Sequence, residues 1–472
     1  MFASPAEALK YIRDNGIAMV DLKVCGMGGQ WMHISLPARR FGLTEFEEGV
    51  GYDGSAESGF TTVECGDVVA IPLPETGFVD PFWNEPTLSF ICRTATADTR
   101  EPLALDPRST AEKAVSHMRQ TGIADEALMA PEFEFHIFDN VQVVDEPYHI
   151  AISIRASETH PDGVTSAIPI KRGYMRVPPT EHLHNLRSEI ALELERLGIP
   201  IRYHHHEVGA PGQCEIEVGL QPLVQAADHT MLIKYVVKNV ARRHNKLATF
   251  MPKPIFGEAG NGMHVHQRLT KAGKPLFFDD RRKNYADLSN LALHYIGGLL
   301  QHGAALTGIT NPSTNSYKRL VEGYEAPVNL FFSLANRSAA IRVPRYATAP
   351  QEKRIEYRPP DFTGNIYATL AGMLMAGLDG IESNIDPSVH HFGPFDVDIA
   401  QQSDEFRRRI APLPRSLYDA LEALEADREF LLKGGVFAEA FFNLWISTKR
   451  RKEAFPVAIR PHPLEYEMYL DV

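Results

Sequence analysis

The sequence contains few cysteines and none of the common cysteine motifs. Its 472 residues include four cysteines, which lie far apart and form no CxxC pair. Disulfide frameworks and zinc knuckles both need cysteines at short or repeated spacings, so neither organises this chain. A reducing cytosol is the compartment that fits best, and we expect a cytoplasmic protein.

Long apolar stretches are also missing. The longest apolar run, Ala371 to Leu378, is broken by Asp379 and is far too short to span a bilayer. Near the start of the chain, Ser4-Pro5-Ala6-Glu7 has the pattern of a helix start, with a capping box and proline at the first helical position. We therefore expect a folded helix there and no targeting segment, and no membrane partner.

The charge balance and two absent motifs restrict the ligands. The formal net charge of -12 argues against bulk nucleic-acid binding, although local basic clusters could still bind phosphate. The sequence has no GxxxxGK[ST] motif and no GxGxxG after a strand. A nucleotide would therefore not be held by a phosphate loop or a Rossmann turn.

Strand-like runs near the N-terminus predict a small mixed domain. Met19–Cys25 and Trp31–Pro37 flank Gly26-Met27-Gly28-Gly29, which predicts a hairpin. Two further strands are expected over Asp67–Pro72 and Thr87–Thr94. This domain should end near the polar segment that begins at Ala95.

The remainder of the chain has the pattern of a larger α+β domain. Helical runs, such as Thr180–Leu197 and Gln225–Arg243, alternate with strand-like runs that carry polar clusters. We place the domains at residues 1–105 and 106–472.

Two of these strand-like runs have the pattern of a metal site. In Pro131–Phe135, Glu132 and Glu134 share one face of the predicted strand while the phenylalanines share the other. The run Gly260–His266 places His264 and His266 in the same alternation. Adjacent carboxylates repel and resist burial, so a bound cation is the best reason for them.

Three more acidic positions extend the pattern. Glu207 follows three histidines, a run that could equally form a solvated turn, and Glu215-Ile216-Glu217 repeats the strand alternation. An alternative to a metal site is that these residues are exposed charges on edge strands. That alternative could explain any one acidic pair, but it explains three such pairs together poorly. An oxygen-rich set with one histidine suits magnesium or manganese better than zinc or copper. His136 falls on the same face, and we treat it as a neighbour and not as a ligand.

A cationic set follows later in the chain. Its members lie within one short stretch: Lys318, Arg319, Arg337, Arg342, Arg345, Lys353, Arg354 and Arg358. Arginine binds carboxylate and phosphate through paired hydrogen bonds. For Arg345 and Lys353, surface ion pairs are as good an explanation. Metal-bound phosphate held by arginines indicates phosphoryl transfer.

Several long motifs, in order along nearly the whole chain, resemble those of bacterial type I glutamine synthetase. They are Asn311 to Leu320, Met251-Pro252-Lys253-Pro254, His204 to Glu207, Val321 to Pro327 and Asn336-Arg337-Ser338. Residues 140–170 match poorly. The resemblance implies a small N-terminal β-grasp domain, a larger catalytic domain, and a dodecamer of two hexameric rings with active sites between subunits.

The resemblance also implies two or more divalent ions, Mg²⁺ or Mn²⁺, in each active site. One ion would be bound by Glu134, Glu207 and Glu215. A second would be bound by Glu132, His264 and Glu356.

The substrates implied by the resemblance are glutamate, ammonium and ATP. Glutamate would be bound by Arg319 and Arg358, near the backbone of Gly260. The ATP phosphates would face His266, Arg337 and Arg342.

The amine end of the site is implied in the same way. Asp53 of a neighbouring subunit would bind and deprotonate ammonium together with Tyr174 and Glu207, and Glu325 would lie on a mobile flap. Asp53, Glu325 and Arg337 would act in catalysis. The reaction would phosphorylate the γ-carboxylate of glutamate and then form the amide of glutamine, while the flap keeps water from the acyl phosphate.

Some positions depart from the family pattern. Ala56 replaces a serine, Ala259 an asparagine in the substrate loop, and Arg268 a serine on the nucleotide side. Three functions therefore remain open: glutamine synthesis, ligation of glutamate to another amine (methylamine, ethanolamine or a polyamine), and a non-catalytic sensor. Retention of every metal ligand favours an enzyme, and Asp53 with Glu207 favours ammonium.

Overall fold

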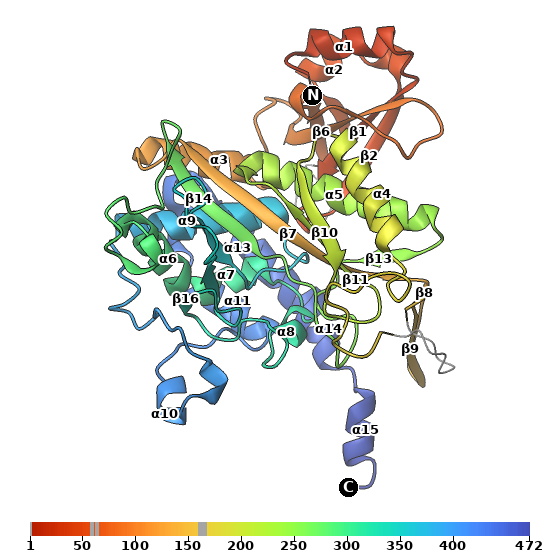
Figure 1. Cartoon of the computed structure of the whole chain (residues 1–472). Coiled ribbons are helices and arrows are strands. Elements are labelled where there is room, and N and C mark those ends of the chain that lie inside the picture. The colour runs from red at the N-terminus through yellow and green to blue at the C-terminus, as the bar shows by residue number, and fades with distance from the viewer. Residues whose placement is uncertain (1, 57–60, 62–65, 159–167) are drawn as a thin grey trace.

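The structure is a computed structural model that describes residues 2–56, 61, 66–158 and 168–472. A small domain that carries the N-terminus lies against a larger body, and the C-terminal helix projects away from that body (Figure 1). The architecture is α+β, as predicted. Among the described residues, no helix is both long and apolar enough to cross a membrane.

The small domain is built on a six-stranded sheet of order β2-β1-β6-β4-β3, with β5 paired to β6. Its strands are β1 (Met19–Cys25), β2 (Trp31–Pro37), β3 (Val50–Asp53), β4 (Asp67–Pro72), β5 (Phe78–Val79) and β6 (Thr87–Thr96). The predicted hairpin is confirmed, since β1 and β2 pair antiparallel from end to end. Helices α1 (Pro5–Asp14) and α2 (Leu43–Glu47) pack on one face around Phe90.

The start of α1 differs from the prediction in one detail. The side chain of Ser4 accepts a hydrogen bond from the Glu7 backbone N–H at 3.3 Å, as expected of an N-cap. The Glu7 carboxylate accepts from the Ala3 N–H at 2.7 Å and not from Ser4. Only half of the expected capping box therefore forms.

The hairpin turn joins the two domains. The side-chain amide of Asn365 donates to the carbonyl oxygens of Gly26 and Met27 at 3.1 and 3.2 Å, and the same residue caps helix α9 (Ile366–Glu382). Gly29 has φ of +79°, and a Cβ there would lie 2.8 Å from the Asn365 Cα. Only glycine fits this contact without a shift.

The larger domain is organised by a ten-stranded sheet of order β10-β11-β7-β14-β18-β17-β16. Its strands are β7 (Glu126–Phe138), β10 (Ile201–His206), β11 (Gln213–Val218), β12 (Gln221–Pro222), β13 (Leu247–Thr249), β14 (Val265–Lys271), β15 (Lys274–Pro275), β16 (Phe332–Leu334), β17 (Ile341–Val343) and β18 (Ile355–Tyr357). The long strand β7 lies between β11 and β14 and also pairs with β12 and β13 (Figure 1).

Helices cover this sheet. The longer ones are α3 (Pro107–Thr121), α4 (His184–Arg196), α5 (Leu223–Arg243), α6 (Asn290–Gln301), α7 (Gly303–Thr310), α11 (Leu417–Ala426) and α13 (Glu439–Lys449). The short ones are α8 (Ser316–Arg319), α10 (Asp404–Arg407), α12 (Glu429–Leu432), α14 (Phe455–Ala458) and α15 (Pro463–Tyr469). The buried helix α9 contacts α3, α5, α6 and α7 and forms the centre of the core.

The two helices expected from the sequence are present with shifted starts. α4 begins at His184 instead of Thr180, because Glu181 accepts hydrogen bonds from the Leu183 N–H and from Arg187 in a preceding turn. α5 begins directly after Pro222 instead of at Gln225.

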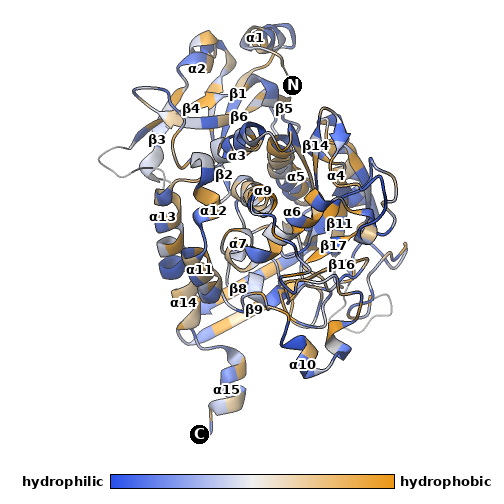
Figure 2. Ribbon diagram, turned by 90° about the vertical axis from the view of Figure 1, so that its left-hand side faces the viewer, coloured by the Kyte–Doolittle hydropathy of each residue, from blue (hydrophilic) through white to orange (hydrophobic). Residues whose placement is uncertain are grey.

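Two segments stand apart from the main body. Strands β8 (Asn140–Glu146) and β9 (His149–Arg155) form a separate two-stranded sheet within the stretch that resembles the family poorly, part of which lies outside the described residues. Helix α15 projects from the molecule (Figure 2). It carries exposed Leu464 and Tyr466, and exposed Leu470 follows it directly.

Candidate active site

Strand pairing brings the predicted acidic residues together. The register places Glu215 of β11 opposite Glu134 of β7, and Glu217 opposite Glu132. On the other side of β7, His266 of β14 pairs with Glu356 of β18. Because alternate residues share a face, these side chains project to one side of the sheet.

The opposite face of β7 explains why the alternation is fixed. Phe133 and Phe135 are fully buried, and their rings lie 5.3 Å from those of Phe362 and Phe250 respectively. If the pairing register of β7 shifted by one residue, the carboxylates would face the core and the phenylalanines would face the cavity. The hydrophobic core therefore determines where the carboxylates point.

A cavity of about 460 Å³ contains nearly all of the predicted site residues. Those that line it are Glu132, Glu134, Tyr174, Glu207, Glu215, Gly260, His264, Arg319, Glu325, Arg337, Arg342, Glu356 and Arg358. His266 and Asp53 do not line it. The carboxylates are buried, with Glu132 and Glu134 only 9% and 8% exposed, so they are not solvated charges on edge strands.

Part of the expected strand pattern is wrong. Residues 260–264 are not a strand, and β14 begins only at Val265. The N–H of Gly262 donates to the Glu134 carboxylate at 2.7 Å, and the Met263 N–H donates to the Pro360 carbonyl. These backbone groups bond to a side chain and a loop, whereas the His264 carbonyl accepts from the Glu132 backbone N–H of β7 at 2.8 Å.

The run His204 to Glu207 is also not a solvated turn. His204, His205 and His206 lie within β10, which pairs with β11. Glu207 directly follows that strand and lines the cavity.

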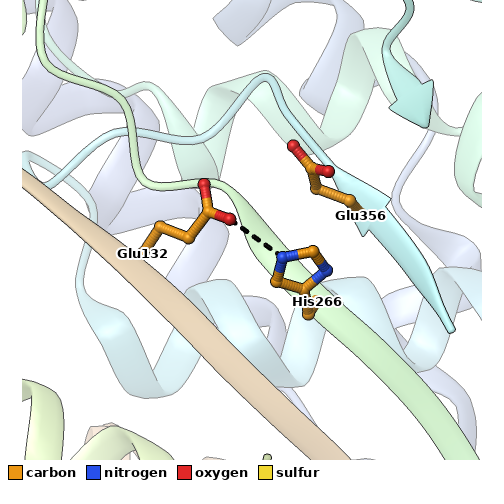
Figure 3. Close-up of side chains that lie close together, drawn as sticks. All are labelled: Glu132, His266 and Glu356. Carbon is orange, nitrogen blue, oxygen red and sulfur yellow. Dashed lines mark hydrogen bonds and ion pairs between the residues drawn. The ribbon is translucent and has the colours of Figure 1, made fainter. Parts of the chain in front are cut away.

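Two sets of three potential ligand atoms lie close enough to bind metal ions. In each set the atoms lie within 4.8 Å of one another, and the sets are Glu132, His266 and Glu356, and His205, Glu207 and Glu215. Figure 3 shows the first set, with a hydrogen bond of 2.9 Å between His266 Nε2 and Glu132. These sets contain His266 and His205 where the resemblance implies His264 and Glu134.

His264 and Glu134 nevertheless lie at the same place. His264 Nδ1 is 2.8 Å from a Glu132 oxygen and 3.8 Å from oxygens of both Glu134 and Glu356. His264 therefore stands between the two groups of carboxylates. His136 contacts Asn261 at 2.9 Å, and burial lowers its pKa to about 3, so it is a neutral neighbour as expected.

The charges of the cluster are unevenly balanced. Burial raises the pKa of Glu215 well above its usual range, and the negative charges of Glu132 and Glu207 add to this. Burial also raises the pKa of Glu134 and of Glu207. Burial acts on Glu132 in the same direction, but hydrogen bonds from His264 and His266 hold its pKa well below the usual range.

This imbalance fits divalent cations. Glu134 and Glu215 are buried and Glu207 is partly buried beside them, and an ionised form needs positive charge close by. Carboxylate oxygens with one imidazole are ligands of the hard, oxygen-preferring kind. The residues present therefore fit bound Mg²⁺ or Mn²⁺.

Glu356 is balanced by arginine. Its carboxylate is ion-paired with both Arg342 and Arg358. Burial would raise the pKa of Glu356, but Arg358 first and the other cations around it lower that pKa to about 2. Of the remaining cationic set, Arg345 is exposed, and Lys353 donates to the Ala286 carbonyl at 2.8 Å instead of forming an ion pair.

Arg319 lies beside the Gly260 segment. Its guanidinium donates to the Pro359 carbonyl at 2.7 Å and to the Arg358 carbonyl at 3.2 Å, and it is 3.4 Å from His264 Nε2. A Cβ on Gly260 would lie 2.9 Å from Arg319 Cγ and 2.4 Å from the Pro252 carbonyl oxygen. Glycine is thus required for the loop to pack this closely.

Glu325 belongs to an irregular segment at the mouth of the cavity. Gly323 and Glu325 have positive φ values of +86° and +56°. The Glu325 carbonyl accepts a hydrogen bond from Arg358 at 3.2 Å. Tyr174 also lines the cavity, with its ring 5.3 Å from that of His205 in an edge-on contact.

Asp53 lies outside this cavity, at the end of β3 in the small domain. It is exposed, and its carboxylate accepts hydrogen bonds from the backbone N–H and the hydroxyl of Ser55 at 2.9 and 2.7 Å. Its proposed place in the active site of a neighbouring subunit stays a prediction.

The three departures from the family pattern fall in different places. Ala259 lines the cavity. Arg268 lies on β14 and donates to the Gln351 carbonyl. The side chain of Ala56 lies outside the described part of the chain.

Several cavity residues were not identified from the sequence. They are Lys171, Arg202, Tyr203, His205, Tyr324 and Tyr346. Glu217, which the Glu-x-Glu alternation indicated, also lines the cavity, and its carboxylate is 2.9 Å from Arg202 and 3.8 Å from His266. No signal for Lys171 or Tyr346 was found in the sequence.

Comparison with known proteins covers both domains. A sequence model for the glutamine synthetase β-grasp domain matches residues 16–97, and one for the glutamine synthetase catalytic domain matches residues 104–469. The chain is 44% identical to a glutamine synthetase from Nostoc sp., over 99% of this chain and all of the relative. It is also 44% identical to one from Streptomyces coelicolor, over the full length of both.

Solved structures agree with this. The Plasmodium falciparum glutamine synthetase has a TM-score of 0.89 at 25% identity, with 99% of each chain covered. GmaS in complex with ADP has a TM-score of 0.81 at 28% identity, over 98% of this chain and 99% of that one. This chain is therefore an enzyme of the glutamine synthetase family, the ATP-dependent glutamate–ammonia ligases that use divalent metal.

Proposed function

We propose that this enzyme makes glutamine from glutamate, ammonia and ATP through a γ-glutamyl phosphate intermediate. The observation that carries the proposal is the cavity whose lining brings together buried carboxylates, arginines and the irregular segment that carries Glu325. Carboxylates to hold divalent ions and arginines to hold anions are what phosphoryl transfer to a carboxylate requires.

Glutamate binding is assigned to the arginine side. Arg319 is fully desolvated, and burial lowers its pKa, although a guanidinium stays charged at neutral pH. With Arg358 and the Gly260 loop, it would orient the substrate carboxylates. This places the γ-carboxylate between the arginines and the acidic cluster.

Phosphoryl transfer is assigned to the centre of the cavity. Glu134, Glu207 and Glu215 would hold one divalent ion, and Glu132, His264 and Glu356 another, with His205 and His266 close enough to share these roles. When bound, such ions neutralise the charge of the transferring phosphoryl group. Arg337, Arg342 and His266 would hold the ATP phosphates.

Amide formation is assigned to the residues around Glu325. Tyr174, Glu207 and Glu325, with Asp53 of a neighbouring subunit, would form a small anionic pocket for ammonium. Asp53 would take a proton from ammonium, since only ammonia is a nucleophile. Ammonia then attacks the acyl carbon, the new C–N bond replaces the C–O bond to phosphate, and phosphate leaves.

The assembly follows from the same assignment. Asp53 does not line the cavity of its own chain, so a complete site needs a second copy. We propose the dodecamer of two hexameric rings with active sites between subunits, acting in the cytoplasm.

Ammonium should be strongly preferred over larger amines. A longer amine must displace the lid and bury apolar carbons among carboxylates, which costs desolvation energy. The test measures glutamate- and ATP-dependent phosphate release and amide product at subsaturating ammonium, methylamine, ethanolamine and a polyamine. Ala259 on the cavity wall favours the alternative, because it removes polar bulk there. If a larger amine forms product faster than ammonium does, the enzyme's function would be ligation of glutamate to that amine and not glutamine synthesis.

Regulation by nucleotidylation of the loop after α9 is not expected. Many members of the family are adenylylated on a tyrosine, and the matching position here is Phe395, which has no hydroxyl. Its half-buried ring packs against Phe331 and Phe406 at 6.0 and 5.3 Å. Mass spectrometry after incubation with an adenylyltransferase should find no modified peptide spanning Phe395 to Ile399, and a nucleotidylated peptide would contradict this.

A further inference from the structure

The lid residue Tyr324 lies between two lysine side chains. Lys253 Nζ is 3.5 Å from the centre of its ring and Lys171 Nζ is 3.9 Å from it. An ammonium group at this distance is attracted by the ring electrons. Two such contacts on one ring connect the lid to two other segments of the chain.

Both lysines are positioned through Glu258. The Glu258 carboxylate is 3% exposed and accepts hydrogen bonds from the backbone N–H groups of Lys171 and Ala210 at 3.0 and 3.2 Å. The Lys253 ammonium donates to the Glu258 carbonyl. Lys171 has a φ of +57°, an unfavourable conformation for lysine, which these contacts hold in place.

The segment that carries Tyr324 is otherwise weakly attached. Glu322, Gly323 and Glu325 are exposed. Its contacts with other parts of the described chain include an ion pair of 3.4 Å between Glu322 and Arg407 and a hydrogen bond from Arg358 to the Glu325 carbonyl. Glu325 follows Tyr324 directly, so holding the ring also holds the proposed ammonium ligand.

We propose that Tyr324, Lys171 and Lys253 form a latch that holds the lid of residues 322–326 closed while the acyl phosphate exists. The three are positioning residues, and the proposal rests on the proposed function. An open lid admits water, whose oxygen bonds to the acyl carbon in place of ammonia as the C–O bond to phosphate breaks. That yields glutamate and phosphate without amide, so an open lid wastes ATP.

The size of the effect follows from the contact energy. A cation–π contact contributes about 0.5–2 kcal/mol, which corresponds to an about 2- to 30-fold change in the ratio of open to closed lid. Loss of either lysine should raise the ratio of phosphate released without amide to amide formed by a factor in this range. Phosphate release itself should persist, because the metal ligands and phosphate-binding arginines are unchanged.

The test compares Lys171→Met and Lys253→Met with the unchanged enzyme at saturating glutamate, ammonium and ATP. Amide and phosphate are measured in the same reaction. Lys171→Arg and Tyr324→Phe keep a cation and an aromatic face, so both should retain coupling. Lys274→Met, an exposed lysine on β15, is the matched control and should behave as the unchanged enzyme.

A second measurement does not depend on the reaction. Backbone hydrogen exchange of residues 321–326 in the full chain should be faster in both lysine variants and in Tyr324→Leu, which leaves the lysines and their bonds to Glu258 in place. Absence of amide from the unchanged enzyme with every amine would overturn the proposed function, while faster exchange would still support the latch. Unchanged exchange together with an unchanged amide-to-phosphate ratio in all three variants would overturn the latch.

Discussion

Replacing Glu134 with alanine should lower synthesis at least about 100-fold, because metal-assisted phosphoryl transfer loses a charged ligand that neutral groups cannot replace. Glu134 lies opposite Glu215 and 3.8 Å from His264 Nδ1, in the middle of the acidic cluster. Steady-state phosphate release and amide formation at ordinary magnesium are the measurements. Glu134→Gln removes the charge but keeps the side-chain shape and should lose activity equally.

The free energy of unfolding of the Glu134 variants distinguishes the loss of a metal ligand from misfolding. Burial raises the pKa of Glu134, so in the metal-free protein its charge opposes folding above the ordinary carboxyl pKa. Glu134→Gln should therefore keep or increase the free energy of unfolding at neutral pH without metal. Glu126→Gln, at the other end of the same strand, is the control. Near-normal turnover of the purified Glu134 variants would disprove the metal assignment.

Replacing Asp53 with alanine should slow amide formation about 100-fold while ATP binding changes little, since the proposed proton transfer follows phosphorylation. Asp53→Asn keeps an acceptor for the turn at Ser55 but cannot take the proton, so it should be similarly slow. Single-turnover experiments that follow ADP and amide separately test this. Asp67→Asn alters the residue directly opposite Asp53 in the sheet and is the matched control. An equal loss of nucleotide binding would make Asp53 a structural residue.

The same variant tests whether sites are shared between chains. Subunits with Asp53→Ala and subunits with Glu134→Ala each lack one half of the proposed site. Mixed oligomers prepared by dissociation and reassembly should recover activity, because some sites would combine an intact Asp53 with an intact Glu134. No recovery in mixed oligomers of confirmed composition would indicate that each chain has a complete site.

The parts of the fold that could be predicted are those set by local patterns. The hairpin of β1 and β2 and the alternation of Glu132 and Glu134 depend on neighbouring residues, so a short stretch of sequence contains the information. The Gly260–His264 segment was assigned wrongly because its backbone hydrogen bonds go to Glu134 and Pro360, which are distant in sequence. Alternation alone does not show where a strand ends.

The candidate site divides in the same way. Glu132, Glu134, Glu215 and Glu217 follow from strand periodicity, and the resemblance supplied most of the remaining members, Glu325 and Glu356 among them. Lys171 was missed because it reaches the cavity only through a loop whose conformation depends on the buried Glu258. The positions of His205 and His266 relative to His264 and Glu134 depend on side-chain directions across three strands, which sequence spacing does not determine.

The two faces of β7 have a consequence for how this enzyme can change under selection. Phe133 and Phe135 are needed by the core, and Glu132 and Glu134 by the chemistry, yet all four occupy consecutive positions on one strand. An insertion or deletion within this strand would harm folding and activity together, so such variants are removed before they can drift toward another function. New specificities in this lineage should therefore arise in loops such as those of Ala259 and Tyr324, which can vary without moving the strand.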